Sequence, residues 1–261
     1  MSYFSTLKSD LNDSDTFKYK KNLSIAKIFQ HLEVVRTMVD YAAAIKKPFQ
    51  DTQTLIIGFI IGFIPFISLL VTGYAMGMAR NILNGDNKLP KWDPGQFVQY
   101  IKDIVFRIII SIVYMIPAGI LFLIGGAALI GTIISAMASG NSSAIASELV
   151  GGIAAGGIFL LLGGLLAIIG GLFAIMGVFF YLKEGNLGAA FQFSAILKKI
   201  LTGTFWVTLV IMAIYSVVLL ILFGLLSIIP FIGTIIGAGL FTFLSTVTGH
   251  TMFAQVFQET P

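Results

Sequence analysis

The chain has 261 residues, of which 57% are hydrophobic and 11% charged, with a formal net charge of +4. A soluble domain carries about 25% charged residues, so the composition excludes an ordinary soluble protein and predicts a multi-pass protein of the cell membrane. The absence of cysteine excludes disulfides, thiolate metal sites and cysteine nucleophiles.

The first fifty residues are polar and charged, without the apolar core of a signal peptide. Residues 1–22 are predicted to be a mobile polar N-terminus. Between residues 23 and 50, apolar side chains recur at helical spacing. This pattern predicts an amphipathic helix that lies on the membrane or against a partner.

The first apolar run, 54–79, opens a membrane domain predicted over 51–258 and has Pro65 near its middle. A spanning helix needs about 20 residues, so this run cannot cross the membrane twice as full helices. Basic residues flank it on both sides, including Lys47 and Arg80, and the positive-inside rule places both flanks in the cytoplasm. The rule therefore favours a proline-broken re-entrant hairpin. The alternative is one span with the N-terminal segment outside.

Four further apolar segments follow, each predicted to span the membrane. Pro230 is the natural break between the last two. The first two exceed one straight span, so we expect tilt, protrusion beyond the lipid, or a kink or break at Pro117. The connections rich in Lys and Arg are cytoplasmic and the uncharged ones lie outside, so the C-terminus is cytoplasmic. The predicted spans are about 104–138, 149–182, 204–229 and 234–257, with a C-terminal tail at 259–261.

The two cytoplasmic connections resemble each other. Each has a Gly-polar turn and an amphipathic stretch that ends in lysine, from Gly85 to Lys102 and from Gly185 to Lys199. We therefore expect an all-α polytopic helical bundle of two related halves with cytoplasmic interfacial helices; two unrelated loops under the same constraints are the alternative. The residues expected at the interface or at lipid headgroups are Lys46, Lys47, Arg80, Lys91, Trp92, Lys102, Arg107, Lys198 and Lys199.

Short motifs along the chain resemble a known family. They are Lys47-Pro48-Phe49-Gln50-Asp51, Ile64-Pro65-Phe66, Gly73-Tyr74, Arg80, Gly85-Asp86, Leu89-Pro90-Lys91-Trp92-Asp93 and the stretch from Gly185 to Phe191. From Ala44 to Phe257 the chain resembles an uncharacterised multi-pass membrane family of archaea and bacteria, known as a domain of unknown function. It is more distantly similar to the membrane domain attached to some glycerophosphodiester phosphodiesterases. The resemblance implies the architecture and no activity.

Glycines recur at fixed intervals in the third apolar run, most of them every seven residues. A seven-residue period keeps one side of a helix against one partner, and glycine lets two backbones approach closely. The pattern predicts a packing seam, either within the bundle or in an oligomer. Its members are Gly152, Gly156, Gly163, Gly170 and Gly177.

Ionisable residues are rare in the apolar runs. His250 is the only one in the last run, which makes it a functional candidate, although its position near the C-terminus also fits the membrane interface. Asp103 and Arg107 lie four residues apart and are expected to pair along one helix, with an ion or headgroup site as the alternative. No hydrolase, phosphate-loop or metal-site motif is present, so no enzymatic activity, cofactor or metal is expected.

Together these features predict a non-enzymatic membrane scaffold or accessory subunit that acts through helix packing and contacts with lipid at the interface. A passive channel, a lipid or small-solute transporter, or a membrane-shaping protein is the alternative. The expected partners are anionic membrane lipids and a second copy or another membrane protein. Nucleic acid is not expected as a partner.

Overall fold

The computed structural model describes residues 39–139 and 142–259. Within these ranges every regular element is a helix. Four of the described helices are long and apolar enough to cross a membrane. The chain is therefore an all-α polytopic protein, which confirms the predicted fold class, and its long apolar helices mark it as embedded in a membrane.

The chain divides into two compact units, Met1–Val39 and Asp40–Pro261. All helices discussed below belong to the second unit. The predicted mobile N-terminus, 1–22, and most of the predicted amphipathic helix, up to residue 38, lie outside the described residues. The described remainder of that segment contains two short helices, α3 (Tyr41–Lys46) and η1 (Lys47–Phe49).

The first apolar run is divided into two helices, α4 (Thr52–Phe63) and α5 (Leu69–Leu83). They have 12 and 15 residues, or about 18 and 22 Å at a rise of 1.5 Å per residue. Neither length crosses a hydrocarbon core of about 30 Å. The single long span that the sequence left open is thus absent from this part of the chain.

The two flanks of this run touch each other. The ammonium group of Lys47, before α4, donates to the carbonyl oxygen of Asn87, after α5, at 2.7 Å. The indole of Trp92 donates to the carbonyl oxygen of Thr54 at 3.3 Å. Since both flanks lie together, the chain enters and leaves this run on one side, as a hairpin requires.

Asp51 begins α4. Its carboxylate accepts hydrogen bonds from the hydroxyl of Thr54 at 2.5 Å and from the backbone N–H of Thr54 at 2.9 Å. This cap satisfies a helix N–H that has no partner within the helix. The same hydrogen bonds, the hydroxyl bond first, hold the pKa of the Asp51 carboxyl below its usual range.

The same four residues, Ile-Pro-Phe-Ile, form the turn after α4 and the turn after α9 (Gly203–Leu226). Phe66 and Phe231 both adopt a positive φ, 65° and 61°. The N–H two residues after each proline donates to the proline carbonyl oxygen, at 2.8 Å after Pro65 and 2.7 Å after Pro230. Proline has a fixed φ and no backbone N–H to donate to a helix, so both helices end near the prolines where the sequence predicted a break.

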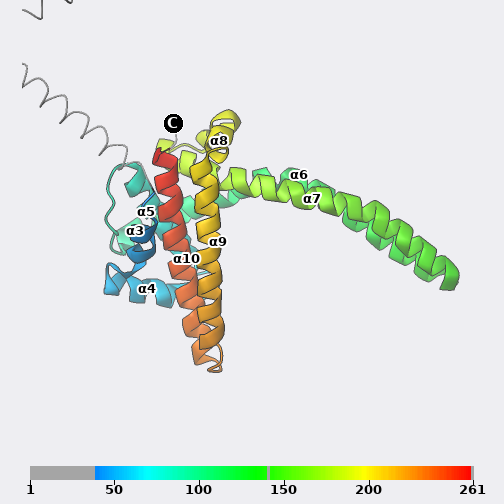
Figure 1. Ribbon diagram of the computed structural model, residues 1–261, viewed down its shortest axis with the longest axis horizontal. Coiled ribbons are helices and arrows are strands. Elements are labelled where there is room, and N and C mark those ends of the chain that lie inside the picture. Colours follow the sequence, from blue (N-terminus) through cyan, green and yellow to red (C-terminus); the bar gives the residue numbers. More distant parts are fainter. Residues whose placement is uncertain (1–38, 140–141, 260–261) are drawn as a thin grey trace, which may run out of the picture. The chain divides into compact units, whose positions relative to one another are not determined.

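The two longest helices, α6 (Phe97–Ser139) and α7 (Ser142–Glu184), lie side by side along their length (Figure 1). Each has 43 residues, or about 64 Å, roughly twice the apolar core of a bilayer. Most residues predicted as an outer loop between them are helical, because serine and glutamate are tolerated in helices.

Pro117 does not end a helix, which corrects the predicted break. The residue lies inside α6, and the helix continues on both sides of it. Proline removes only one backbone donor, and neighbouring helices can accommodate that loss in a membrane protein.

The glycine seam of α7 faces α6. A Cβ at Gly156 would lie 2.8 Å from the carbonyl oxygen of Gly125, and one at Gly170 would lie 2.5 Å from that of Tyr114. Gly163 approaches Phe122, and the remaining two, Gly152 and Gly177, also meet side-chain or backbone atoms of α6 within 3.1 Å. The seam therefore serves packing within the chain at all five predicted positions.

The rest of the unit packs around α10 (Ile232–Glu259), which contacts α4, α5 and α9. In Figure 1, α9 and α10 lie side by side, and α6 and α7 run across their direction. A short helix, α8 (Phe193–Ile200), connects to α9. The largest fully buried side chains include Tyr74, Tyr181 and Phe243, so the core lies where α5, α7 and α10 meet.

Helix ends gather at one end of this core. Lys183 donates to the carbonyl oxygen of Leu83, and Lys199 to that of Phe257, both at 2.8 Å. The last carbonyls of a helix lack partners within it, and a cation there also offsets the negative end of the helix dipole. The C-terminal ends of α5, α7 and α10 therefore lie on the same side.

The two connections predicted to be related share their local geometry. α5 and α7 are both followed by a glycine at positive φ, Gly85 at 92° and Gly185 at 74°. A 3₁₀ helix comes next in each, η2 (Pro94–Gln96) capped by Asp93 and η3 (Leu187–Phe191) capped by Asn186. This likeness fits the prediction of two related halves.

Candidate functional site

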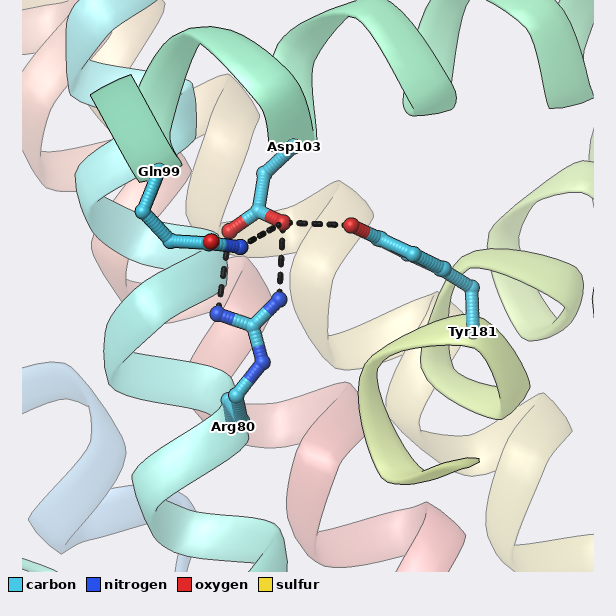
Figure 2. Close-up of polar contacts among 4 residues, drawn as sticks. All are labelled: Arg80, Gln99, Asp103 and Tyr181. Atoms are coloured by element: carbon cyan, nitrogen blue, oxygen red, sulfur yellow. Dashed lines mark hydrogen bonds and ion pairs between the residues drawn. The ribbon is translucent and has the colours of Figure 1, made fainter. Parts of the chain in front are cut away.

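A buried carboxylate joins three helices beside the gathered helix ends. Figure 2 shows Asp103 of α6 between Arg80 of α5, Gln99 of α6 and Tyr181 of α7. The guanidinium of Arg80 donates to both carboxylate oxygens, at 2.7 and 3.0 Å. Gln99 and Tyr181 donate to Oδ1 at 2.8 and 2.6 Å. We call these four residues the Asp103 cluster.

The Asp103 cluster has the properties of a structural joint. The Asp103 side chain is 0% exposed and that of Arg80 is 25% exposed. A buried carboxylate is tolerated when a bidentate arginine and further donors satisfy it. Its hydrogen bonds fix the start of α6 and the end of α7 against α5, and leave Oδ1 fully engaged.

One helical turn beyond Asp103, Arg107 points to a different environment. It lies on the wall of a cleft of about 600 Å³ formed by α5, α6, α7, α9 and α10. We call this the Arg107 cleft. Residues four apart on a helix share a face, so Ser111 and Met115 line the same wall. The remaining lining residues are Thr72, Gly171, Ala174, Ile175, Val178, Phe179, Met212, Ser216, Phe241, Ser245, Thr246, Gly249, His250 and Phe253.

Arg107 is half-buried, and in the described part of the chain its guanidinium makes no ion pair or hydrogen bond. The expected pairing with Asp103 is corrected, because Asp103 is engaged by Arg80, whose fork reaches both oxygens. A guanidinium carries five donors that favour carboxylate or phosphate oxygens. The cleft lining contains no aspartate or glutamate to meet it.

His250 also lines the Arg107 cleft. Its Nδ1 lies 2.8 Å from the carbonyl oxygen of Thr246. A carbonyl only accepts, so Nδ1 carries the hydrogen in this bond, and Nε2 of the neutral ring is left as an acceptor. His250 is half-buried in the Arg107 cleft, and both a functional role and a place near the membrane interface stay predictions.

Several cations predicted at lipid headgroups are used inside the protein. Lys47 and Lys199 are 3% and 7% exposed, and burial lowers the pKa of both ammonium groups. Arg80 is held in the Asp103 cluster and Arg107 faces the cleft. Trp92, expected as an interface anchor, stacks on the Tyr74 ring at 4.3 Å between centroids. The predicted interfacial residues that are exposed are Lys46, Lys91, Lys102 and Lys198.

Gln99 and Tyr181 were not predicted as site residues. Tyr181 contacts Asp103 from 78 positions away in the chain, and no local pattern signals such a pairing. Gln99 lies four residues before Asp103, a helical spacing that allows a side-chain hydrogen bond and was available in the sequence.

A family model described as "Protein of unknown function (DUF4013)" matches residues 56–228. The chain belongs to the DUF4013 family. This confirms the predicted membership of an uncharacterised domain family. No curated protein and no solved structure matches this DUF4013 chain. The similarity to the membrane domain of glycerophosphodiester phosphodiesterases stays a prediction.

The matched region of the DUF4013 chain includes Arg107 and the Asp103 cluster and ends before α10. The Arg107 cleft therefore combines walls inside and outside the matched region. Chemically, it offers guanidinium and hydroxyl donors within a mostly apolar lining. The acceptor nitrogen of His250 suits an anion only where that anion carries a proton of its own. Such a set can hold an anionic group away from water.

Proposed function

We propose that this protein binds an anionic group, either a lipid headgroup or a free anion, in the Arg107 cleft and does so without catalysing a reaction. The observation that carries the proposal is a half-buried guanidinium, without an ion pair among the described residues, on the wall of a 600 Å³ cleft. A charge removed from water is costly unless it is paired. An anion in the cleft supplies that pair.

Hydroxyl groups supplement the guanidinium. Ser216 and Ser245 contribute no donor, because each donates its proton to a carbonyl oxygen of its own helix, at 2.8 and 2.6 Å. Thr72 and Ser111 line the cleft, and their hydroxyls make no hydrogen bond within the described chain. Their hydroxyls are therefore available as donors to an anion beside Arg107.

The absence of catalysis is part of the proposal. Hydrolysis through His250 needs a nucleophile or activated water and a group that orients the imidazole. The ring is oriented by a backbone carbonyl, and the lining of the cleft offers no carboxylate. Binding, with or without transport of the bound anion, is what these groups support.

The scaffold or accessory role remains a prediction alongside this proposal. Its main support in the sequence, the glycine seam, is occupied by α6. A homo-oligomer or a complex with another membrane protein would use a different face. The exposed lysines Lys46, Lys91, Lys102 and Lys198 support contacts with anionic lipid headgroups.

We also propose an orientation of the chain in the membrane. Basic residues lie at the end where α5, α7 and α10 finish, and the positive-inside rule assigns that end to the cytoplasm. The C-terminus is then cytoplasmic, in the cell membrane, as the sequence predicted.

The test is binding of inorganic phosphate and octyl phosphate to the full chain in phosphatidylcholine nanodiscs, with octyl glucoside as the uncharged comparison. We expect Arg107→Gln to weaken phosphate binding about tenfold or more, the loss of roughly one charge-assisted contact. Lys88→Gln removes one charge from an exposed loop position and should leave binding unchanged. Equal binding by the Arg107→Gln and unaltered chains, or equal binding of octyl glucoside, overturns the proposal.

A further inference from the structure

A second groove lies between α9 and α10. Its volume is about 290 Å³, and its lining is apolar throughout. Leu222 and Leu225 are 50% and 59% exposed, so the groove opens on the outer, lipid-facing side of these helices. The lining residues are Leu219, Leu222, Phe223, Leu225, Leu226, Gly237, Leu240, Phe241 and Leu244.

The groove continues the Arg107 cleft. Phe241 is half-buried and lines both, so the two spaces adjoin at this residue. Ser245 and His250 lie on the cleft side of Phe241, whereas Gly237 and Leu240 lie on the groove side. The polar and apolar spaces therefore follow each other along α10.

Glycine lets α9 and α10 approach closely within the groove. A Cβ at Gly237 would lie 2.3 Å from the ring of Phe223, so a larger residue there would require the ring or the helix to move. Leucines line the groove on both sides of this contact, Leu219 and Leu244 nearer to the cleft and Leu225 and Leu226 beyond it.

The dimensions match a lipid chain. From His250 to Leu240, which lines the groove, α10 advances by 10 residues, or about 15 Å. One leaflet occupies half of the hydrocarbon core, about 15 Å. A headgroup at Arg107 would therefore place a chain of ordinary length beside the groove, pointing away from the charged end of the helices.

We infer that the ligand is an anionic membrane lipid, with its charged group in the Arg107 cleft and one acyl chain in the groove between α9 and α10. This rests on the proposed anion-binding function and adds the apolar half of the ligand. The bilayer also surrounds an acyl chain with apolar groups, so the groove offers no hydrophobic gain over lipid. It contributes packing contacts that hold the chain in one position.

The test compares butyl, octyl and dodecyl phosphate in phosphatidylcholine nanodiscs. Leu240→Trp fills the groove. The matched control is Leu220→Trp, at a 50% exposed position of α9 outside the groove. Each probe partitions into the bilayer equally for both variants, so partition cancels in the comparison. We expect Leu240→Trp to weaken the binding of dodecyl phosphate about threefold to tenfold relative to the control. The affinity for butyl phosphate should not change.

The outcomes separate the two proposals. If butyl phosphate binds through Arg107 but the tryptophan variants bind dodecyl phosphate equally, the acyl-chain inference is overturned and the anion site stands. If no phosphate depends on Arg107, the proposed function fails. Should Leu240→Trp not fold, Leu226→Trp gives a second way to fill the groove, and the same comparison decides.

Discussion

Alanine at Gly170 tests how closely α6 and α7 approach. A Cβ at this position would lie 2.5 Å from the carbonyl oxygen of Tyr114, a separation that requires the backbones to move apart. Overpacking of this kind costs about 1–3 kcal/mol. Replacing glycine by alanine in a helix returns about 1 kcal/mol. We therefore expect Gly170→Ala to lower the free energy of unfolding by up to about 2 kcal/mol.

Gly164 supplies the matched control on the same helix, because nothing lies within 4 Å of its Cβ position. Gly164→Ala keeps the gain in helix propensity without the clash and should stabilise the protein by up to about 1 kcal/mol. The difference between the variants is then about 1–3 kcal/mol, or about 2–12 °C in melting temperature for a protein of this size. The assay is thermal unfolding of both purified variants in one detergent. Equal melting temperatures, or a higher one for Gly170→Ala, would refute the close approach.

Tyr181→Phe removes one hydrogen bond from a buried carboxylate and should cost about 1.5–3 kcal/mol; an unchanged melting temperature contradicts the structural joint. The pKa of Asp51 is lowered in the folded state, so its cap contributes stability above the unfolded pKa of about 3.9 that is lost as the pH falls through the lower folded pKa. Asp51→Asn should flatten the fall in melting temperature below about pH 4, and an unchanged acid profile counts against the cap. Because the chain has no native cysteine, single cysteines at Phe49 and Asn87 should react with an impermeant reagent from the same side of sealed vesicles, and one at Phe231 from the other. Labelling of the first two from opposite sides excludes the hairpin.

The sequence was sufficient for what depends on composition and short-range spacing. Apolar runs located the long helices, because about 20 apolar residues in succession have few alternatives to a membrane. The proline turns ended α4 and α9 near the expected positions. Ile-Pro-Phe-Ile occurs at both turns, and comparing these four letters would have predicted that the two turns share one geometry.

Tertiary pairing was beyond the reach of local patterns. Asp103 and Arg107 have the spacing of a helical pair, yet Arg80 lies on a neighbouring helix and satisfies both carboxylate oxygens of Asp103. Because Asp103 is engaged by Arg80, Arg107 has no ion pair among the described residues. The sequence alone does not show this. Likewise, the sequence cannot distinguish a lysine at a headgroup from Lys199, which donates to a helix end 58 positions away.

Four basic residues act at two stages, during insertion into the membrane and in the assembled protein. They are Lys47, Arg80, Lys183 and Lys199. In the proposed orientation, these residues count among the positive charges that keep their loops in the cytoplasm while the chain enters the membrane. Once the helices have assembled, each of them donates hydrogen bonds within the protein. A neutral substitution at any of these positions alters both the orientation signal and the assembled state. Insertion and assembly of this protein therefore share the same few charges, and a defect in one step will carry over to the other.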